Sequence, residues 1–330
     1  MPLQTIGVIG AGTWGTALAV NAARAGRSVV LWGRDQDAIK AMRTSRINQR
    51  YLPDIDLSAA IDLTSDLNDL RDVETLLLVV PAQTMSGILE RLPSGDQPLV
   101  ICAKGLERSS NRRLSEIVRD NQPQRPVAAL SGPNFAREVA LGLPAAATVA
   151  SDDETFGRQF AAAMSHEQFR VYWTDDMIGV EIGGAVKNVL AIASGIVMGR
   201  GFGENAKAAL ITRGLAELTR LGRALGARPE TLTGLSGLGD LLLTAGSLTS
   251  RNMAFGHSIG AGTEPVHSRD EPGMLVEGVF TAKAVVSLAA HHRIDMPICQ
   301  AIDAILEGRL SIDRAIETLM TRPIRPENPS

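Results

Sequence analysis

The chain has 330 residues, of which 45% are hydrophobic and 21% are charged, and its formal net charge is −3. This length allows two domains with a sizeable core, and the charge gives no general attraction to nucleic acid or to an anionic membrane. Only two cysteines occur, far apart, and no signal-type segment opens the chain, so we expect a cytoplasmic protein without disulfides. The five histidines lack metal-ligand spacing, and we expect no metal site.

The first elements predict a dinucleotide-binding unit. A short apolar strand at residues 5–9 precedes the sequence GAGTWG, an alanine-rich helix follows, and a second strand is predicted at residues 28–32. In this context Gly10 makes the tight turn, Gly12 lets the backbone approach a pyrophosphate, and Gly15 lets the helix pack against the strand. The helix N-terminus then offers free N–H groups to the phosphates. A purely structural glycine turn is the alternative.

The residues after the second strand bear on cofactor choice. NAD-specific sites place an acidic residue here to bind the adenosine ribose, whereas this chain has Gly33-Arg34-Asp35. Arg34 is suited to a 2′-phosphate, and Asp35 to a 2′-hydroxyl. We therefore predict NADP(H) as the preferred cofactor and NAD(H) as an alternative one. A solvated loop arginine is the other interpretation of Arg34.

Further buried strands end in polar or turn-forming segments. Apolar runs are predicted as strands at 75–80, 99–102, 127–130, 145–150 and 169–172, with a helix at 152–164. In open parallel sheets, ligands bind beyond the carboxyl ends of the strands. We therefore expect Lys104, Gly132 and Asn134 to face the same crevice as the pyrophosphate; for Lys104 alone, a surface lysine is the alternative.

From residue 175 onwards the periodicity is helical. Helices are predicted at 180–198, 205–225, 281–292, 298–307 and 311–320. The fold class is thus α/β, with an N-terminal Rossmann-like, doubly wound sheet and a C-terminal all-α part. We expect a dinucleotide-binding domain at residues 1–174 and a helical substrate and catalytic domain at residues 175–330.

The helix at 180–198 is apolar on every face, with Lys187 as its one charged side chain after Ile182. Such a helix is buried all round, and its glycines suit a close approach by other backbone or by a ligand. A transmembrane span is disfavoured by the central lysine. Two interpretations remain: a structural lysine paired with a carboxylate, or a lysine with a lowered pKa that exchanges protons. Asp240 lies in a tight, glycine-dense turn between apolar residues and offers a carboxylate. Arg251 lies in the compact polar turn Ser-Arg-Asn and is suited to bind a phosphate.

These motifs together resemble the bacterial-type NAD(P)-dependent glycerol-3-phosphate dehydrogenases. The likeness runs from residue 5 to about residue 320 and includes GAGTWG, KGLE, SGPNFA, GGAVKN, ALITRGL, GLGD, TSRN and VEG. The resemblance implies reversible reduction of dihydroxyacetone phosphate to sn-glycerol 3-phosphate, which supplies glycerophospholipid synthesis, and a homodimer without a membrane span. β-Hydroxyacid dehydrogenases and a cofactor-binding sensor are the rival classes.

The resemblance also implies roles for individual residues. Lys187 is the expected proton donor and acceptor at the C2 oxygen. The expected substrate-binding residues are Lys104, Gly132, Asn134, Lys187, Asn188, Asp240, Ser250, Arg251 and Asn252. The expected cofactor-binding residues are Gly10, Gly12, Thr13, Trp14, Gly15, Arg34, Lys104, Ala136, Arg251, Leu275 and Glu277. Asn134 and Leu275 depart from the family pattern, which usually has Thr or Ser and Val there.

Overall fold

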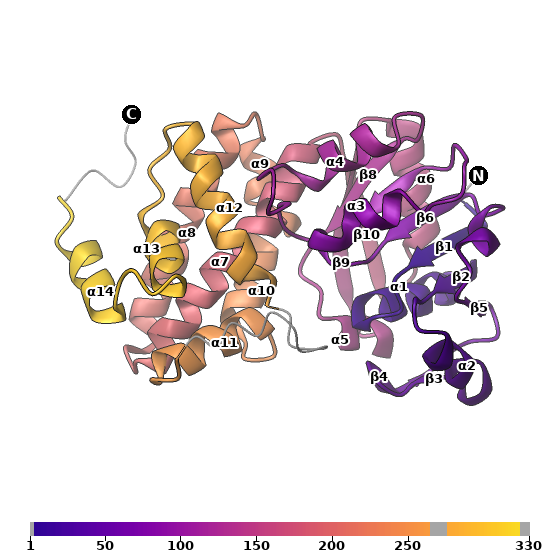
Figure 1. The fold of residues 1–330 in the computed structure, drawn as a ribbon, viewed down its shortest axis with the longest axis horizontal. Helices are drawn as coiled ribbons and strands as arrows, with labels where there is room; N and C mark the ends of the chain where they lie inside the picture. Colours follow the sequence, from indigo (N-terminus) through magenta and orange to yellow (C-terminus); the bar gives the residue numbers. More distant parts are fainter. Residues whose placement is uncertain (1–2, 265–275, 324–330) are drawn as a thin grey trace.

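The computed structural model describes residues 3–264 and 276–323. An N-terminal part built on a large sheet lies beside a C-terminal part made of helices (Figure 1). The last strand of the sheet ends at Thr174, and the first helix of the helical part begins at Met177.

The sheet has eight strands in the order β10-β9-β8-β7-β6-β1-β2-β5. Their bounds are β1 Thr5–Ile9, β2 Ser28–Trp32, β5 Ile61–Thr64, β6 Thr75–Leu78, β7 Leu99–Ile101, β8 Val127–Ser131, β9 Ala145–Ser151 and β10 Phe169–Thr174. A separate antiparallel pair comprises β3 Ile47–Asn48 and β4 Leu52–Asp56. All seven predicted strands are present. Strands β2 and β5 lie on one side of β1 and strand β6 lies on the other, so the order of the strands across the sheet reverses at β1, as in doubly wound sheets.

Two features of the sheet differ from the prediction. Strand β9 pairs antiparallel with β8, and β10 pairs parallel with β9, so these two strands run opposite to the rest. Their carboxyl ends therefore lie at the other edge of the sheet from those of β1, β6, β7 and β8. Strand β5 was not predicted because its four residues include an exposed aspartate, which gives too short an apolar pattern.

Helices cover both faces of the sheet. They are α1 Thr13–Arg24, α2 Gln36–Ser45, α3 Met85–Leu89, α4 Leu114–Asn121, α5 Ala136–Leu141 and α6 Glu154–Met164, with short 3₁₀ turns at Leu67–Leu70 and Ala82–Thr84. Along β6, Leu77 packs into a core with α1 and α6, whereas Leu76 and Leu78 pack into a core with α3 and α4. This alternation follows from the period of two in a strand, and it explains why the strands read as continuous apolar runs.

The helical part contains no strand within residues 175–264 and 276–323. Its helices are α7 Met177–Gly199, α8 Gly203–Ala224, α9 Pro229–Leu232, α10 Asp240–Gly246, α11 Arg251–Gly260, α12 Glu277–His291, α13 Pro297–Leu306 and α14 Ile312–Met320, and the turn Leu235–Gly239 precedes α10. The five predicted helices are present with slightly different ends. The helices between residues 229 and 260 were not predicted, because glycines and polar residues interrupt the periodicity there.

Helix α7 is the centre of the helical part (Figure 1) and packs against α8, α10, α11 and α12. It is long and apolar enough to span a membrane, but most of its apolar window is buried inside the protein. A Cβ added at Gly195 would lie 2.1 Å from the Met253 carbonyl oxygen, and one at Gly256 of α11 would lie 2.1 Å from that of Ile192. The glycines of α7 therefore allow helix backbones to touch.

Candidate active site

The glycine-rich loop between β1 and α1 has the geometry that its spacing predicts. Gly10 has φ +121°, and a Cβ there would meet the Val79 carbonyl oxygen at 2.6 Å. A Cβ at Gly15 would lie 1.8 Å from the Gly10 carbonyl oxygen. Close contact with neighbouring backbone therefore explains why the first and third positions of the motif are glycine.

Gly12 is different, because a Cβ placed on it would meet no atom within 4 Å. It is the N-cap of α1, whose first turn has no side-chain cap and no acidic residue. The free N–H groups and the positive end of the helix dipole suit an anion here. Thr13 is exposed and Trp14 is half-buried beside them, so this loop fits the pyrophosphate of a dinucleotide.

The end of β2 carries the residues expected to distinguish the two cofactors. Arg34 is exposed. The Asp35 side chain caps α2 by accepting a hydrogen bond from the Ala38 backbone N–H at 3.0 Å. This helix cap gives Asp35 a structural role that the sequence analysis did not assign.

A buried cluster of charges joins the two parts of the molecule. The Lys187 Nζ on α7 lies 2.7 Å from Oδ1 of Asp240 at the start of α10, and it also donates to the Thr244 hydroxyl at 2.7 Å. The Lys104 Nζ, after β7, lies 2.6 Å from the other carboxylate oxygen of Asp240 and donates to the Gly132 carbonyl at 3.0 Å. One carboxylate, with its side chain 1% exposed, therefore holds two ammonium groups.

The surroundings shift the pKa values of this cluster. The pKa of Lys187 is lowered from 10.5 to about 8, chiefly by burial and also by the second ammonium of Lys104, against the opposing charge of Asp240. Burial acts to raise the pKa of Asp240, but Lys104 and Lys187 outweigh it and hold that pKa below its usual value. Lys187 is thus a buried group that exchanges its proton close to neutral pH, as a general acid requires.

Hydrogen bonds between amide groups connect Asn188, the neighbour of Lys187, to α11 and α12. Asn252 Nδ2 donates to Asn188 Oδ1 at 3.0 Å, and the Gly278 N–H donates to Asn252 Oδ1 at 3.0 Å. Ser250 caps α11 through the Met253 N–H at 3.3 Å, and Arg251, the first residue of α11, is exposed. Side chains that the sequence analysis placed in a turn therefore stand at a helix N-terminus.

Glu277 begins α12 close to the same charges. Burial raises the pKa of its carboxyl, whereas the positive charges of Arg251, Lys187 and Lys104 act to lower it. The hydrogen bond from the Gly278 N–H to Asn252 places the start of α12 beside α11. Leu275, also expected at the cofactor, lies outside the described residues.

The loop after β8 supplies the remaining predicted residues. Gly132 has φ +147°, which few other residues adopt. Asn134 Nδ2 donates to the Ala146 carbonyl at 3.0 Å, while its buried Oδ1 has no hydrogen-bond partner. Ala136 begins α5. A buried orphan acceptor is rare, and a donor group of a bound ligand, such as the amide of a nicotinamide, would satisfy it.

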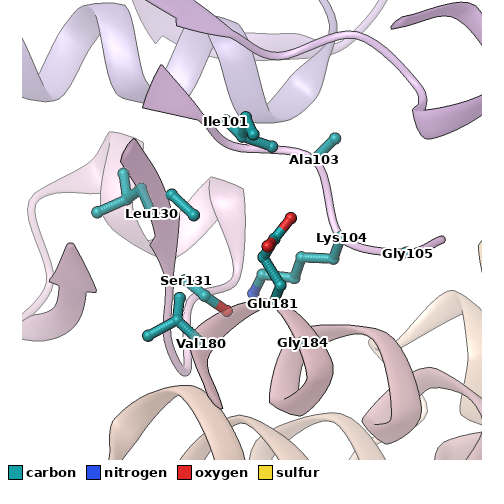
Figure 2. A pocket seen from close by; sticks show the side chains of 10 residues that line it. Ile101, Ala103, Lys104, Gly105, Leu130, Ser131, Val180, Glu181 and Gly184 are labelled. Atoms are coloured by element: carbon teal, nitrogen blue, oxygen red, sulfur yellow. The ribbon is translucent and has the colours of Figure 1, made fainter. Parts of the chain in front are cut away.

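Figure 2 shows a small cavity between the segment after β7 and α7, with Lys104 and Glu181 among its lining side chains. Its volume is about 10 Å³, enough for one water molecule. Ser131 also lines it, and the buried hydroxyl of this serine has no hydrogen-bond partner. The described residues contain no group of three or more His, Cys, Asp or Glu side chains that could hold a metal ion.

The structure therefore brings Lys187, Asp240, Lys104 and Gly132 into direct contact, and it joins Asn188 to Asn252. The sequence analysis missed Thr244, which bonds to both Lys187 and Asp240. Thr244 lies four residues after Asp240, which puts both on one face of a helix. The spacing would have revealed it had this segment been predicted as helical.

Comparison with known proteins identifies the family of the chain. Models of the N-terminus and C-terminus of NAD-dependent glycerol-3-phosphate dehydrogenase match residues 5–157 and 176–317. The chain is 53% identical over 326 residues to the NAD(P)+ glycerol-3-phosphate dehydrogenase of Azorhizobium caulinodans, covering 98% of both chains. The crystal structure of glycerol-3-phosphate dehydrogenase from Coxiella burnetii superimposes with a TM-score of 0.91 at 40% identity, covering 97% of this chain and 99% of the other. The chain belongs to the family of bacterial-type NAD(P)-dependent glycerol-3-phosphate dehydrogenases.

Proposed function

We propose that the protein reversibly reduces dihydroxyacetone phosphate to sn-glycerol 3-phosphate with NADPH, or less readily with NADH, and so supplies glycerophospholipid synthesis. The observation that carries this proposal is the buried Lys187–Asp240 ion pair of 2.7 Å beside the sheet edge where the glycine-rich loop lies. We also propose that residues 1–174 bind the dinucleotide and that residues 175–330 bind the substrate, in a cytoplasmic homodimer.

Lys187 gives a proton to the C2 oxygen of the substrate as the reduction proceeds. The bound dinucleotide supplies the hydride that C2 receives. Asp240 opposes the loss of the proton from Lys187 before reaction, and Thr244 and Asp240 fix the direction of its ammonium. Lys104 adds a second positive charge beside the oxygen on which negative charge develops, which lowers the barrier electrostatically.

The polar N-terminus of α11 binds the end of the substrate that does not react. Arg251 clamps the phosphate with its planar guanidinium, and Ser250, Asn252 and Asn188 contribute polar contacts around it. Gly132 and Asn134 border the reacting end of the substrate. Binding energy from the phosphate then positions C2 for reaction.

The cofactor lies across the glycine-rich loop. Gly10, Gly12, Thr13, Trp14 and Gly15 form the loop that would hold its pyrophosphate, and Arg34 would bind the 2′-phosphate. Its remaining contacts are to Lys104, Ala136, Arg251, Leu275 and Glu277. The open space at Gly12 and the orphan acceptor of Asn134 support this assignment.

A substrate comparison tests the proposed activity. The wild-type protein should oxidise NADPH rapidly with dihydroxyacetone phosphate and poorly with dihydroxyacetone. Arg251→Ala should lower kcat/KM for the phosphorylated substrate by ~30- to 150-fold, the worth of about 2–3 kcal/mol of charge-assisted hydrogen bonding, and Arg251→Lys should restore part of it.

Arg314→Ala, which removes an exposed arginine on α14, is the matched control and should leave kcat/KM unchanged. Equal losses for both substrates in Arg251→Ala would assign the arginine to the cofactor or to the fold. Absence of NADPH oxidation by the wild-type protein would refute the proposed activity, and a role in binding the cofactor without turnover would replace it.

A further inference from the structure

Residues 103–113, between β7 and α4, form a segment that we call the interdomain strap. The strap leaves the sheet part and packs into the helical part. Its contacts are the Lys104–Asp240 ion pair, the burial of Leu106 in the core of the helical part, the Arg108 guanidinium 5.7 Å from the Phe280 ring, and the Asn111 Nδ2 hydrogen bond to Ser287 at 3.3 Å. The position of Lys104 over Asp240 therefore depends on how the strap is held.

Glu181, on the second turn of α7, holds the far end of the strap. Its carboxylate accepts hydrogen bonds from the backbone N–H of Ser115 at 2.8 Å and from the Ser115 hydroxyl at 2.5 Å, and Arg113 lies 3.5 Å away. Ser115 is in the first turn of α4, where helix N–H groups lack partners within the helix. A carboxylate from the helical part thus caps a helix of the sheet part.

The same helix carries the proton donor. Glu181 precedes Lys187 by six residues, or ~9 Å along the axis of α7. Figure 2 shows Glu181 and Lys104 lining one cavity above α7, with Gly184 of that helix on its floor. Asp240 at one end of the strap and Glu181 at the other therefore tie the strap to the helix that carries Lys187.

We propose that Glu181 is a positioning residue for the reduction: by capping α4 it fixes the interdomain strap, and through the strap it holds the Lys104 ammonium in place beside Asp240 and Lys187. The expected effect on kcat rests on the proposed function, whereas the expected effect on the structure of the strap does not. Glu181 does not itself touch the substrate. The environment supports a fixed cap, because the side chain is 5% exposed and two hydrogen bonds from Ser115 hold it.

The chain offers a matched control in Glu217 of α8. Its carboxylate is also buried, its pKa is also raised by burial, and it accepts hydrogen bonds from the N–H groups of Ile298 at 2.7 Å and Cys299 at 3.2 Å. Glu217 therefore caps α13 as Glu181 caps α4, but both of its helices lie within the helical part. Replacing either glutamate by glutamine removes the negative charge and one of the two acceptor oxygens from the same kind of cap.

Hydrogen exchange tests the structural step without reference to activity. In Glu181→Gln, the amides of residues 103–115, and that of Ser115 above all, should exchange at least ~10-fold faster than in the wild-type protein, because the hydrogen bonds that close the segment lose the charge of their acceptor. In Glu217→Gln, exchange there should be unchanged and should rise only around Ile298. Equal exchange of residues 103–115 in the two variants would overturn the proposal.

Steady-state kinetics test the catalytic step. Glu181→Gln should lower kcat about tenfold or more, since a misplaced charged group loses much of its effect. Glu217→Gln should keep the wild-type kcat. In a Lys104→Met background, Glu181→Gln should cause no further loss, because its effect passes through Lys104. Ser115→Ala, which removes one of the two Ser115 bonds, should give a smaller loss and is available if Glu181→Gln folds poorly. The same fold loss in both Lys104 backgrounds would refute the inference, whereas inactivity of the wild-type protein would refute the proposed function alone.

Discussion

The pH dependence of the reduction should change in opposite directions when the two neighbours of Lys187 are replaced. A general acid must be protonated, so kcat/KM should fall as the pH rises through the pKa of Lys187, which is about 8. Asp240 raises that pKa and Lys104 lowers it. Asp240→Asn should therefore move the alkaline limb to lower pH, and Lys104→Met should move it to higher pH.

The geometry sets the size of these effects. Asp240 lies 2.7 Å from the Lys187 ammonium in a site where its side chain is 1% exposed. Removing one partner of a buried pair costs ~3–5 kcal/mol, and about 1.4 kcal/mol corresponds to one pH unit. Because the Thr244 bond to Lys187 remains, we expect the limb of Asp240→Asn to move by at least ~1 pH unit. The Lys104→Met limb should move less, since Lys104 is the weaker of the two influences.

The assay is the rate of NADPH oxidation at low dihydroxyacetone phosphate, measured across neutral and alkaline pH for the wild-type protein and both variants. The profile of kcat/KM reports the titration of groups before the varied substrate binds. Shifts of the same sign in both variants would contradict the argument, because one variant removes an attractive charge and the other a repulsive one. An unshifted limb in Asp240→Asn would mean that Lys187 is not the titrating acid.

Three further predictions concern single substitutions. Lys187→Met, which keeps the apolar stem, should lower kcat by ~10²–10⁴ while NADPH binding, followed by fluorescence titration, stays close to wild type; a nearly unchanged kcat would assign the proton to another donor. Arg34→Ala should raise KM for NADPH roughly tenfold or more and leave KM for NADH unchanged, and equal changes for both cofactors would refute recognition of the 2′-phosphate. Gly195→Ala should lower the free energy of unfolding by ~1–3 kcal/mol, measured by thermal unfolding, because its Cβ would overlap the backbone of α11. The control is Gly87→Ala in α3, whose Cβ would meet no atom within 4 Å and which should raise the free energy of unfolding by ~0.5–1 kcal/mol. Equal effects of the two substitutions would contradict the packing argument.

The sequence predicts best where one physical constraint dominates. Helix α7 was predicted because apolar residues on every face leave no side for water, and the strands because burial on both faces removes their alternation. The directions of β9 and β10 were not accessible, because the apolar pattern of a buried strand is the same in either direction. The contact between Lys187 and Asp240 joins residues 53 positions apart, and only the resemblance to a family suggested it.

The features that were not predicted are those in which polar side chains accept hydrogen bonds from backbone N–H groups at helix ends. The cap that the Asp35 side chain forms on α2 was not predicted, although this residue had been considered as a ribose ligand. Glu181 received no role, because a single carboxylate at the start of an apolar helix does not reveal its partner. Its partner is the first turn of α4, a helix in the other part of the molecule. Helix caps between distant elements carry no local signal beyond the residue type.

The net charge of the buried cluster bears on how it would stabilise negative charge on the C2 oxygen of the substrate. Lys187 and Lys104 contribute two positive charges and Asp240 one negative charge, so the cluster has a net charge of +1. A buried charge without a partner is costly, and the pKa of Lys187, lowered to about 8, shows that this cost has not been fully offset. Negative charge developing on the C2 oxygen would supply the missing partner at the moment of hydride transfer, whereas the neutral carbonyl of the ground state would not. Under the proposed mechanism the cluster would therefore be more complementary to the transition state than to the substrate, which is the condition for catalysis. Fixing Lys104 through the strap and Glu181 would preserve that difference.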